Sequence, residues 1–253
     1  MKLQRAKASK KWIKICGNTN LTDAQFAAES GADAVGFVFA PSPRQILPEA
    51  AASITAHLPH TMEKYGVFVD ADFETIVHTV ETAGLTGVQL HAAPAMGLAQ
   101  RLRAHFTQQP VRIVQVLHYV PDAARFAADL HALHAQQELD AVLIDSRTAT
   151  LVGGTGIAFD WQSARAAFAR EERALHLIAA GGLRPENVAE AIHTLHPWGV
   201  DVSSGVEAQP GKKDPERVAR FLRAARAAAA AMESAQQAPP EFAHSPGRKG
   251  ASQ

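Results

Sequence analysis

The only cysteine of the chain, Cys16, ends a short apolar run and is followed directly by Gly17. An ionised thiol can remove a proton from carbon, but a free thiol has a pKa of about 8.5, so a cation or a hydrogen-bond donor must lower it. Gly17 would leave a substrate room to approach the sulfur. A lone cysteine is also commonly a small buried hydrophobe, and position and composition alone favour that second interpretation.

Two carboxylates and one imidazole also lie within apolar runs or at their ends, as Cys16 does. Asp145 ends the run AVLI, where it could donate a proton if its pKa is raised from about 3.9, or could cap a turn or pair with Arg147. Asp201 lies between valines in GVDV, so it must face a barrel interior or a partner that offsets its desolvation. His91 closes VQLH and could be an acid, a base or a hydrogen-bonding scaffold.

Arg44 lies in the loop PSPRQI, in which two prolines restrict the backbone. A guanidinium held in this way could bind a carboxylate or a phosphate through two parallel hydrogen bonds. A solvated surface arginine is the alternative. The residues around Arg44 do not decide between them.

Three glycine-containing loops are candidate anion sites: GGTG at 153–156, AAGG at 179–182 and SSG at 203–205. Glycine allows the backbone to come close to a ligand, and free N–H groups at the start of a helix bind phosphate. Each loop could instead serve only as a tight turn. Three such loops at one rim favour the phosphate site.

Eight short apolar runs position these residues, and alanine-rich segments with helical periodicity lie between them. Continuous apolar runs are typical of parallel strands that are buried on both faces. The predicted strands are 12–16, 34–39, 65–69, 87–90, 112–117, 141–144, 176–180 and 199–202. Because polar or glycine residues follow almost every strand, the pattern favours a single α/β domain, a (β/α)8 TIM barrel, over an open sheet with one switch point.

The predicted barrel domain spans 11–232. Residues 1–10 are expected to form a basic polar tail, and residues 233–253, rich in Pro, Gly, Gln and Ser, a disordered tail. The helix-forming segment 221–232 is expected to complete the last helix.

The composition narrows the function. Lys+Arg and Asp+Glu are equal at 25 each, so no overall field recruits nucleic acid or a membrane, and a small-molecule partner is expected. We find neither a long apolar span nor a secretory signal, which favours a cytoplasmic protein. No HExxH motif occurs among the 12 histidines, and no metal is predicted. The oligomeric state stays open between monomer and homodimer.

Taken together and in order, the loops closely resemble those of the phosphoribosylanthranilate isomerase family of tryptophan biosynthesis. The resemblance implies a (β/α)8 barrel that converts N-(5-phosphoribosyl)anthranilate into 1-(2-carboxyphenylamino)-1-deoxyribulose 5-phosphate by an Amadori rearrangement without a cofactor. The matching segments are KICGN (14–18), GADAVGFVFAPSPR (31–44), GVFVD (66–70), VQLH (88–91), LIDSR (143–147), GGTGIAFDW (153–161), AGGLRPENV (180–188) and DVSSGVEAQPGKKD (201–214).

The resemblance also implies residue roles. Cys16 would be the general base, Asp145 the general acid, and Arg44 the ligand of the anthranilate carboxylate. His91 and Asp201 are further candidates for substrate binding. Phosphate would be held by the backbone of the loops that contain Gly154, Gly182, Ser204 and Gly205.

Two departures from the family pattern concern loop geometry. The segment from Phe39 to Arg44 is one residue shorter than is usual, and Ala92 stands where many relatives carry glycine. The sequence alone does not establish that Lys14 assists Cys16, because residues two apart in a strand share a face but are separated by about 6–7 Å.

Two rival functions were weighed. A related phosphoribosyl-sugar isomerase of histidine synthesis would need paired aspartates after the first and fifth strands, where this chain has Cys16 and His118. A non-catalytic phosphate-binding barrel would use the glycine loops alone, and the intact pair of Cys16 and Asp145 argues against it.

Overall fold

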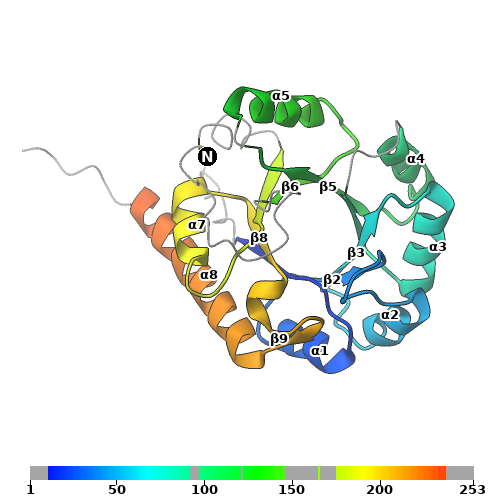
Figure 1. Ribbon diagram of the computed structural model, residues 1–253, viewed down its shortest axis with the longest axis horizontal. Helices are drawn as coiled ribbons and strands as arrows, with labels where there is room; N and C mark the ends of the chain where they lie inside the picture. Colours follow the sequence, from blue (N-terminus) through cyan, green and yellow to red (C-terminus); the bar gives the residue numbers. More distant parts are fainter. Residues whose placement is uncertain (1–10, 92–96, 121, 146–164, 166–174, 238–253) are drawn as a thin grey trace, which may run out of the picture.

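Eight parallel strands close into a barrel in the order in which they occur in the chain, with helices around it (Figure 1). The structure, a computed structural model, describes residues 11–91, 97–120, 122–145, 165 and 175–237. The strands are β1 (Trp12–Ile15), β2 (Ala34–Val38), β3 (Glu63–Val69), β4 (Gly87–His91), β5 (Arg112–His118), β6 (Ala141–Asp145), β7 (His176–Ala180) and β8 (Gly199–Val202). The predicted (β/α)8 barrel is confirmed, and each predicted run falls on a strand.

Helices follow most of the strands, and short polar side chains begin several of them. The side chains of Asn20, Asp72 and Asp122 accept hydrogen bonds from backbone N–H groups in the first turn of the helix that follows each. The helices are α1 (Leu21–Glu29), α2 (Pro48–Thr55), α3 (Phe73–Ala83), α4 (Leu98–His105), α5 (Ala123–His134), α7 (Val188–Leu195) and α8 (Pro215–Gln237).

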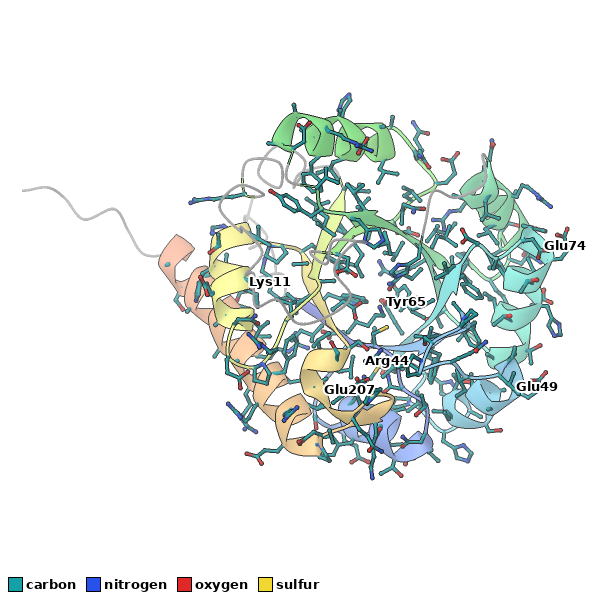
Figure 2. The ribbon with its side chains drawn as sticks, viewed as in Figure 1. Lys11, Arg44, Glu49, Tyr65, Glu74 and Glu207 are labelled. Atoms are coloured by element: carbon teal, nitrogen blue, oxygen red, sulfur yellow. The ribbon has the colours of Figure 1, made fainter. Side chains whose placement is uncertain are left out.

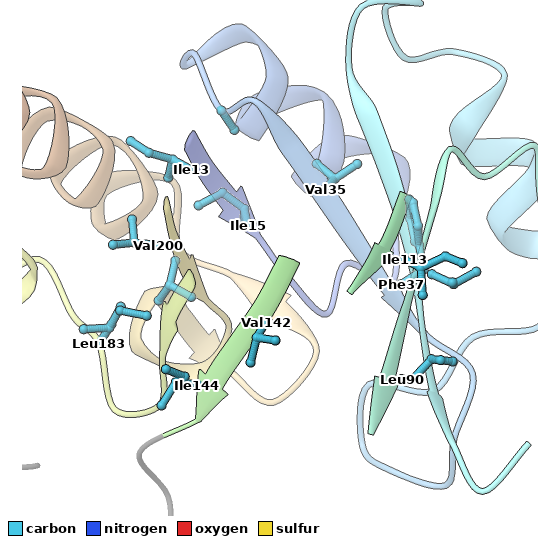
Figure 3. Close-up of a cluster of buried hydrophobic side chains, with 14 of the residues drawn as sticks. Ile13, Ile15, Val35, Phe37, Leu90, Ile113, Val142, Ile144, Leu183 and Val200 are labelled. Atoms are coloured by element: carbon cyan, nitrogen blue, oxygen red, sulfur yellow. The ribbon is translucent and has the colours of Figure 1, made fainter. Parts of the chain in front are cut away.

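Side chains along each strand point alternately outward and inward, so they belong to two separate hydrophobic cores. Ile13, Ile15, Val35 and Phe37 point outward and pack in the cluster between strands and helices (Figure 3). The alternate residues fill the barrel interior, where Trp12 belongs to a separate buried cluster. Because side chains two apart in a strand share a face, the residues of β1 that follow Trp12 on the inner face are Lys14 and then Cys16.

Aromatic side chains close the amino-terminal end of the barrel. The ring of Trp12 lies edge-on to Tyr65, with centroids 5.6 Å apart, and stacks on Trp198 at 5.3 Å. Glu63 accepts hydrogen bonds from Trp12 Nε1 at 3.2 Å and from the Tyr65 hydroxyl at 2.8 Å. Burial and the carboxylate of Glu63 raise the pKa of Tyr65 well above its ordinary range. These contacts fill the interior at this end of the barrel with packed aromatic rings, an arrangement that we call the aromatic floor.

Several features near the carboxyl end differ from the prediction or extend it. A short helical turn, η1 (Ser204–Val206), leads into an antiparallel pair, β9 (Glu207–Gln209) and β10 (Lys212–Lys213), too short to leave a periodic signal. Helix α8 continues to Gln237, beyond the expected start of the tail at 233, because its alanines favour helix.

The rest of both predicted tails, as well as Ala92, Arg147 and Gly154, lies outside the described residues. Within the described ranges, no helix has the length and apolar content that crossing a membrane requires.

Candidate active site

A cavity of about 240 Å³ opens at the carboxyl ends of the strands. All of the predicted site residues that the structure describes line it, namely Cys16, Arg44, His91, Asp145, Gly182, Asp201, Ser204 and Gly205. They come from loops and strand ends all around the barrel, as is usual for this fold. The structure therefore brings these residues together at one rim, and their individual roles stay predictions.

Cys16 lies directly after β1, and its position is fixed by a backbone hydrogen bond to Val202 on β8 at 2.8 Å. The residue is only 6% exposed. Burial raises the pKa of the thiol above its ordinary value, whereas the charges of Lys14 and Lys213 lower it and that of Asp201 raises it. The net shift is upward, so the thiol of the ligand-free protein does not ionise more readily than a free cysteine.

Lys14 reaches Cys16 in spite of the distance along the strand. Its long side chain lies buried on the inner face, and its ammonium group lies close enough to the thiol to lower the pKa of Cys16. The backbone spacing alone did not establish this influence, which depends on the length of the Lys14 side chain. Gly36 leaves the space for this contact, since a Cβ there would lie 2.7 Å from the sulfur and 2.9 Å from Cε of Lys14.

Two further partners hold Lys14. Its ammonium donates to Oε1 of Gln89 at 2.5 Å and to Oδ2 of Asp201 at 3.0 Å. Burial alone would lower the pKa of Lys14, but the charges of Asp201 and Cys16 outweigh it and raise that pKa. Lys14 is therefore charged at neutral pH.

Asp201 has one satisfied and one unsatisfied oxygen. Oδ2 accepts from Lys14, which is the partner that offsets the desolvation of this carboxylate. Oδ1 is buried and has no hydrogen-bond partner among the residues that the structure describes. Since Asp201 also lines the cavity, this oxygen can accept a hydrogen bond from a ligand hydroxyl.

Gln89 links Lys14 to His91. Because Oε1 of Gln89 accepts from Lys14, its amide nitrogen faces Nε2 of His91, at 3.1 Å. The amide can only donate there, so Nε2 accepts and a neutral His91 carries its proton on Nδ1. The ring of His118 lies beside His91, with centroids 6.0 Å apart. His91 thus has a defined tautomer at the rim.

Asp145 is the last residue of β6 and is 5% exposed. It shares the inner face with Leu143, and in the sheet it pairs with His118 on one side and Ala180 on the other. Counting round the barrel, β6 and β1 are three strands apart, so Asp145 and Cys16 approach the cavity from different directions.

Arg44 is held by the chain itself, so the interpretation of Arg44 as a solvated arginine is wrong. Its Nε and Nη2 donate to the two carboxylate oxygens of Glu207 at 2.8 and 2.6 Å, and Figure 2 shows the two side chains together beside the cavity. Gly17 adopts a positive φ of 73°, and a Cβ there would lie 2.7 Å from Cδ of Arg44 and 2.8 Å from Oγ of Ser203. The space beside Gly17 therefore holds these side chains, not a substrate as expected.

The glycine loops after β7 and β8 also touch each other. A Cβ on Gly205 would lie 1.8 Å from the carbonyl oxygen of Leu183, so only glycine fits this packing. Gly182 has a positive φ of 63°, and a Cβ there would meet nothing within 4 Å. Gly205 is thus required by close packing between the two loops, whereas the positive φ of Gly182 fits the tight-turn interpretation, and both glycines line the cavity.

Sequence reasoning missed four residues of the site, Lys14, Gln89, Glu207 and Lys213. The strand period carried a usable signal for two of them, since Lys14 and Gln89 lie two positions before Cys16 and His91 and must share their face. Within the described ranges, no three His, Cys, Asp or Glu residues are grouped as metal ligands.

A closed (β/α)8 barrel with its candidate residues gathered at the carboxyl-terminal mouth has the architecture of a TIM-barrel enzyme. The family model described as N-(5'-phosphoribosyl)anthranilate (PRA) isomerase matches residues 13–224. The chain belongs to this family.

Individual relatives agree with this assignment. The N-(5'-phosphoribosyl)anthranilate isomerase of Citrifermentans bemidjiense is 44% identical over 214 residues, covering 83% of this chain and 94% of the relative. The crystal structure of the Thermotoga maritima enzyme superposes with a TM-score of 0.74 at 38% identity, covering 86% and 99% of the two chains. A phosphoribosyl anthranilate isomerase in complex with reduced 1-(o-carboxyphenylamino)-1-deoxyribulose 5-phosphate gives 0.71 at 36% identity, with the same coverage.

Proposed function

We propose that this protein is the isomerase of tryptophan biosynthesis that converts N-(5-phosphoribosyl)anthranilate into 1-(2-carboxyphenylamino)-1-deoxyribulose 5-phosphate. One observation carries the proposal. A thiol and a carboxyl group, Cys16 and Asp145, line the same cavity as a fixed arginine and two glycine loops. The reaction needs a proton donor, a proton acceptor, and sites for a carboxylate and a phosphate.

The two proton transfers divide between the two side chains. Asp145 donates a proton to the ribose ring oxygen as the ring opens to an imine. Cys16, as thiolate, then removes the proton from C2′, and the resulting enolamine tautomerises to the ketone. Charged Lys14 lies against the sulfur and stabilises the thiolate form while the base is in use.

The remaining residues bind the substrate. Gly182, Ser204 and Gly205 line the cavity, and their backbone N–H groups are proposed to bind the phosphate. Gly154, the other residue expected to bind phosphate, lies outside the described residues. Arg44 binds the anthranilate carboxylate. Oδ1 of Asp201 and the ring of His91 face the ribose hydroxyls, for which they offer an acceptor and a defined tautomer. Both steps are proton transfers, so the proposed mechanism uses no cofactor.

Location and assembly stay predictions. A cytoplasmic location fits a biosynthetic enzyme that acts on a phosphorylated metabolite. A related structure is described as monomers generated from the dimeric Thermotoga maritima enzyme, so both a monomer and a homodimer are compatible with this family.

Direct turnover tests the proposal. The purified protein is incubated with freshly prepared phosphoribosylanthranilate, and formation of the carboxyphenylamino product is followed. The histidine-pathway aminoimidazole substrate, offered in parallel, tests the rival isomerase. We expect turnover of the first substrate, and growth of a tryptophan-requiring host that lacks this isomerase step. Absence of both results, with the protein folded, would overturn the proposal.

A further inference from the structure

A buried charged cluster connects the β9–β10 hairpin to the rim of the cavity. Glu207 opens β9, and its side chain is only 4% exposed. Arg44 donates one hydrogen bond to each carboxylate oxygen of Glu207. In addition, Oε1 of Glu207 accepts from Nζ of Lys213 at 3.0 Å and from the backbone N–H of Gly211 at 3.3 Å. The carboxylate is therefore fixed from two directions, by the hairpin and by Arg44.

The geometry leaves part of the guanidinium available. An arginine has five N–H donors in one plane, and Glu207 occupies the edge formed by Nε and Nη2 of Arg44. The end formed by Nη1 and the second N–H of Nη2 can hold another carboxylate in the same bidentate manner. Arg44 is thus shaped to bind two carboxylates, one from the protein and one from a ligand in the cavity that it lines.

The charges of the cluster favour an incoming anion. Arg44 and Lys213 contribute two positive charges against the single negative charge of Glu207. The side chain of Lys213 is 2% exposed, and besides Glu207 its ammonium donates to the carbonyl of Ser203 at 3.3 Å. Burial lowers the pKa of Lys213, and the negative charge of Glu207 offsets part of that effect, so a further anion nearby would favour the charged ammonium. A ligand carboxylate on Arg44 would supply the missing negative charge.

We infer that Glu207, supported by Lys213, is a positioning residue that presents Arg44 to the aryl carboxylate of the substrate. The inference rests on the proposed function. It implies that the β9–β10 hairpin contributes to selectivity for substrates that carry a carboxylated aryl amine. Glu207 itself does not touch the substrate. It acts by fixing the plane and direction of the guanidinium, so that little conformational freedom is lost when the carboxylate binds.

Two ligands that differ only in the carboxylate test the inference. The first is reduced 1-(2-carboxyphenylamino)-1-deoxyribulose 5-phosphate, and the second is the same molecule with phenyl in place of carboxyphenyl. For Glu207→Gln we expect the Kd of the first to rise about 10- to 100-fold, as for loss of a hydrogen-bonded charge, while that of the second changes less than about 3-fold. Equal weakening of both ligands would show that Glu207 only maintains the fold, and would overturn the inference.

A double-mutant cycle shows whether the effect passes through Arg44. In an Arg44→Ala background, Glu207→Gln should cost no further affinity for the carboxylated ligand, whereas additive losses would contradict the inference. Glu186→Gln is the matched control, because Glu186 also pairs with an arginine, Arg220 at 2.9 Å, but at the surface. It should leave both Kd values unchanged.

Kinetics separate this inference from the proposed function. With phosphoribosylanthranilate, Glu207→Gln should raise KM and leave kcat within about 3-fold. A wild-type protein that binds both ligands but does not turn over this substrate would sink the proposed function, and the ligand comparison would still decide the role of Glu207.

Discussion

The ammonium of Lys14 lies one layer deeper in the barrel than Cys16 and lowers the pKa of its thiol, while the same ammonium is paired with Asp201 at 3.0 Å. The ammonium of Lys14 thus interacts with both the carboxylate of Asp201 and the thiol of Cys16, which is the weaker acid of the two. Asp201 neutralises Lys14 in the resting site, and the thiolate shares that charge when Cys16 ionises. The contact explains how a buried sulfur, whose pKa burial raises, can still act as a base.

Removing the charge of Lys14 should shift the pH profile. Lys14 lowers the pKa of Cys16, so Lys14→Met should raise that pKa and move the limb on which kcat/KM increases with pH to higher pH. Initial rates at low substrate concentration across neutral and alkaline pH measure the limb in the free enzyme.

The double variant Lys14→Met/Asp201→Asn is the control. Asp201 raises the pKa of Cys16, so its neutralisation should return the limb part of the way toward the wild type. An unchanged limb in Lys14→Met would exclude Lys14 from the ionisation of Cys16.

Cys16→Ala and Asp145→Asn should each lower kcat by about 10²- to 10⁴-fold with KM largely kept, as expected when a positioned proton-transfer group is removed. Both side chains are buried at the rim, so thermal unfolding should be recorded beside the kinetics. Near-normal turnover in either folded variant would remove that residue from its role.

Arg44→Ala should mainly weaken binding. The variant loses the proposed carboxylate ligand but no proton-transfer group, so KM should rise about 10- to 100-fold while kcat changes much less. Steady-state kinetics with phosphoribosylanthranilate separate the two constants. A change in kcat alone would contradict the carboxylate-binding role.

Gly36→Ala should affect activity and Gly66→Ala should not. A Cβ at either glycine would clash at 2.7 Å, with the sulfur of Cys16 in the first case and with Leu85 and Phe68 in the second. Both variants should lower the free energy of unfolding by about 1–3 kcal/mol. Only Gly36→Ala displaces Cys16 and Lys14, so it alone should reduce kcat/KM by about 10-fold or more. An equal loss of activity in both would show a general effect of packing.

Glu207 should stabilise the fold at neutral pH and lose this effect in acid. Burial works against its charged form, but Arg44 and Lys213 outweigh burial and lower the pKa of Glu207 below its ordinary 4.5. A carboxyl group with a lowered pKa in the folded state contributes stability above its unfolded pKa and loses it as the pH falls through the folded pKa. The stability difference between the wild type and Glu207→Gln, from urea unfolding, should therefore shrink below pH 4.5. A difference independent of pH would contradict the lowered pKa.

The sequence was sufficient to predict the barrel because most residues of the eight barrel strands are buried on both faces and therefore read as apolar runs, as in AVLI of β6. The rim was predictable for the same reason, since the residue that ends each run must lie at the mouth. Cys16, His91 and Asp145 were found in this way.

Charged residues inside the strands were harder to interpret. Lys14 interrupts an apolar run, and only the structure shows that Asp201 and Gln89, from strands far away in the sequence, pair with it. The pairing of Arg44 with Glu207 spans 163 positions, and nothing local in the sequence of either residue indicates the other. Long-range partners of this kind depend on the closure of the barrel and leave no periodic signal.

The aromatic floor made by Trp12, Tyr65 and Trp198 has a kinetic consequence. Because packed aromatic rings fill the amino-terminal end, the opening of the cavity at the carboxyl ends of the strands is the route for both reactant and product. A bound product therefore prevents the next substrate from binding. Product inhibition that is competitive with substrate follows from the architecture of the barrel, whichever side chains carry out the chemistry.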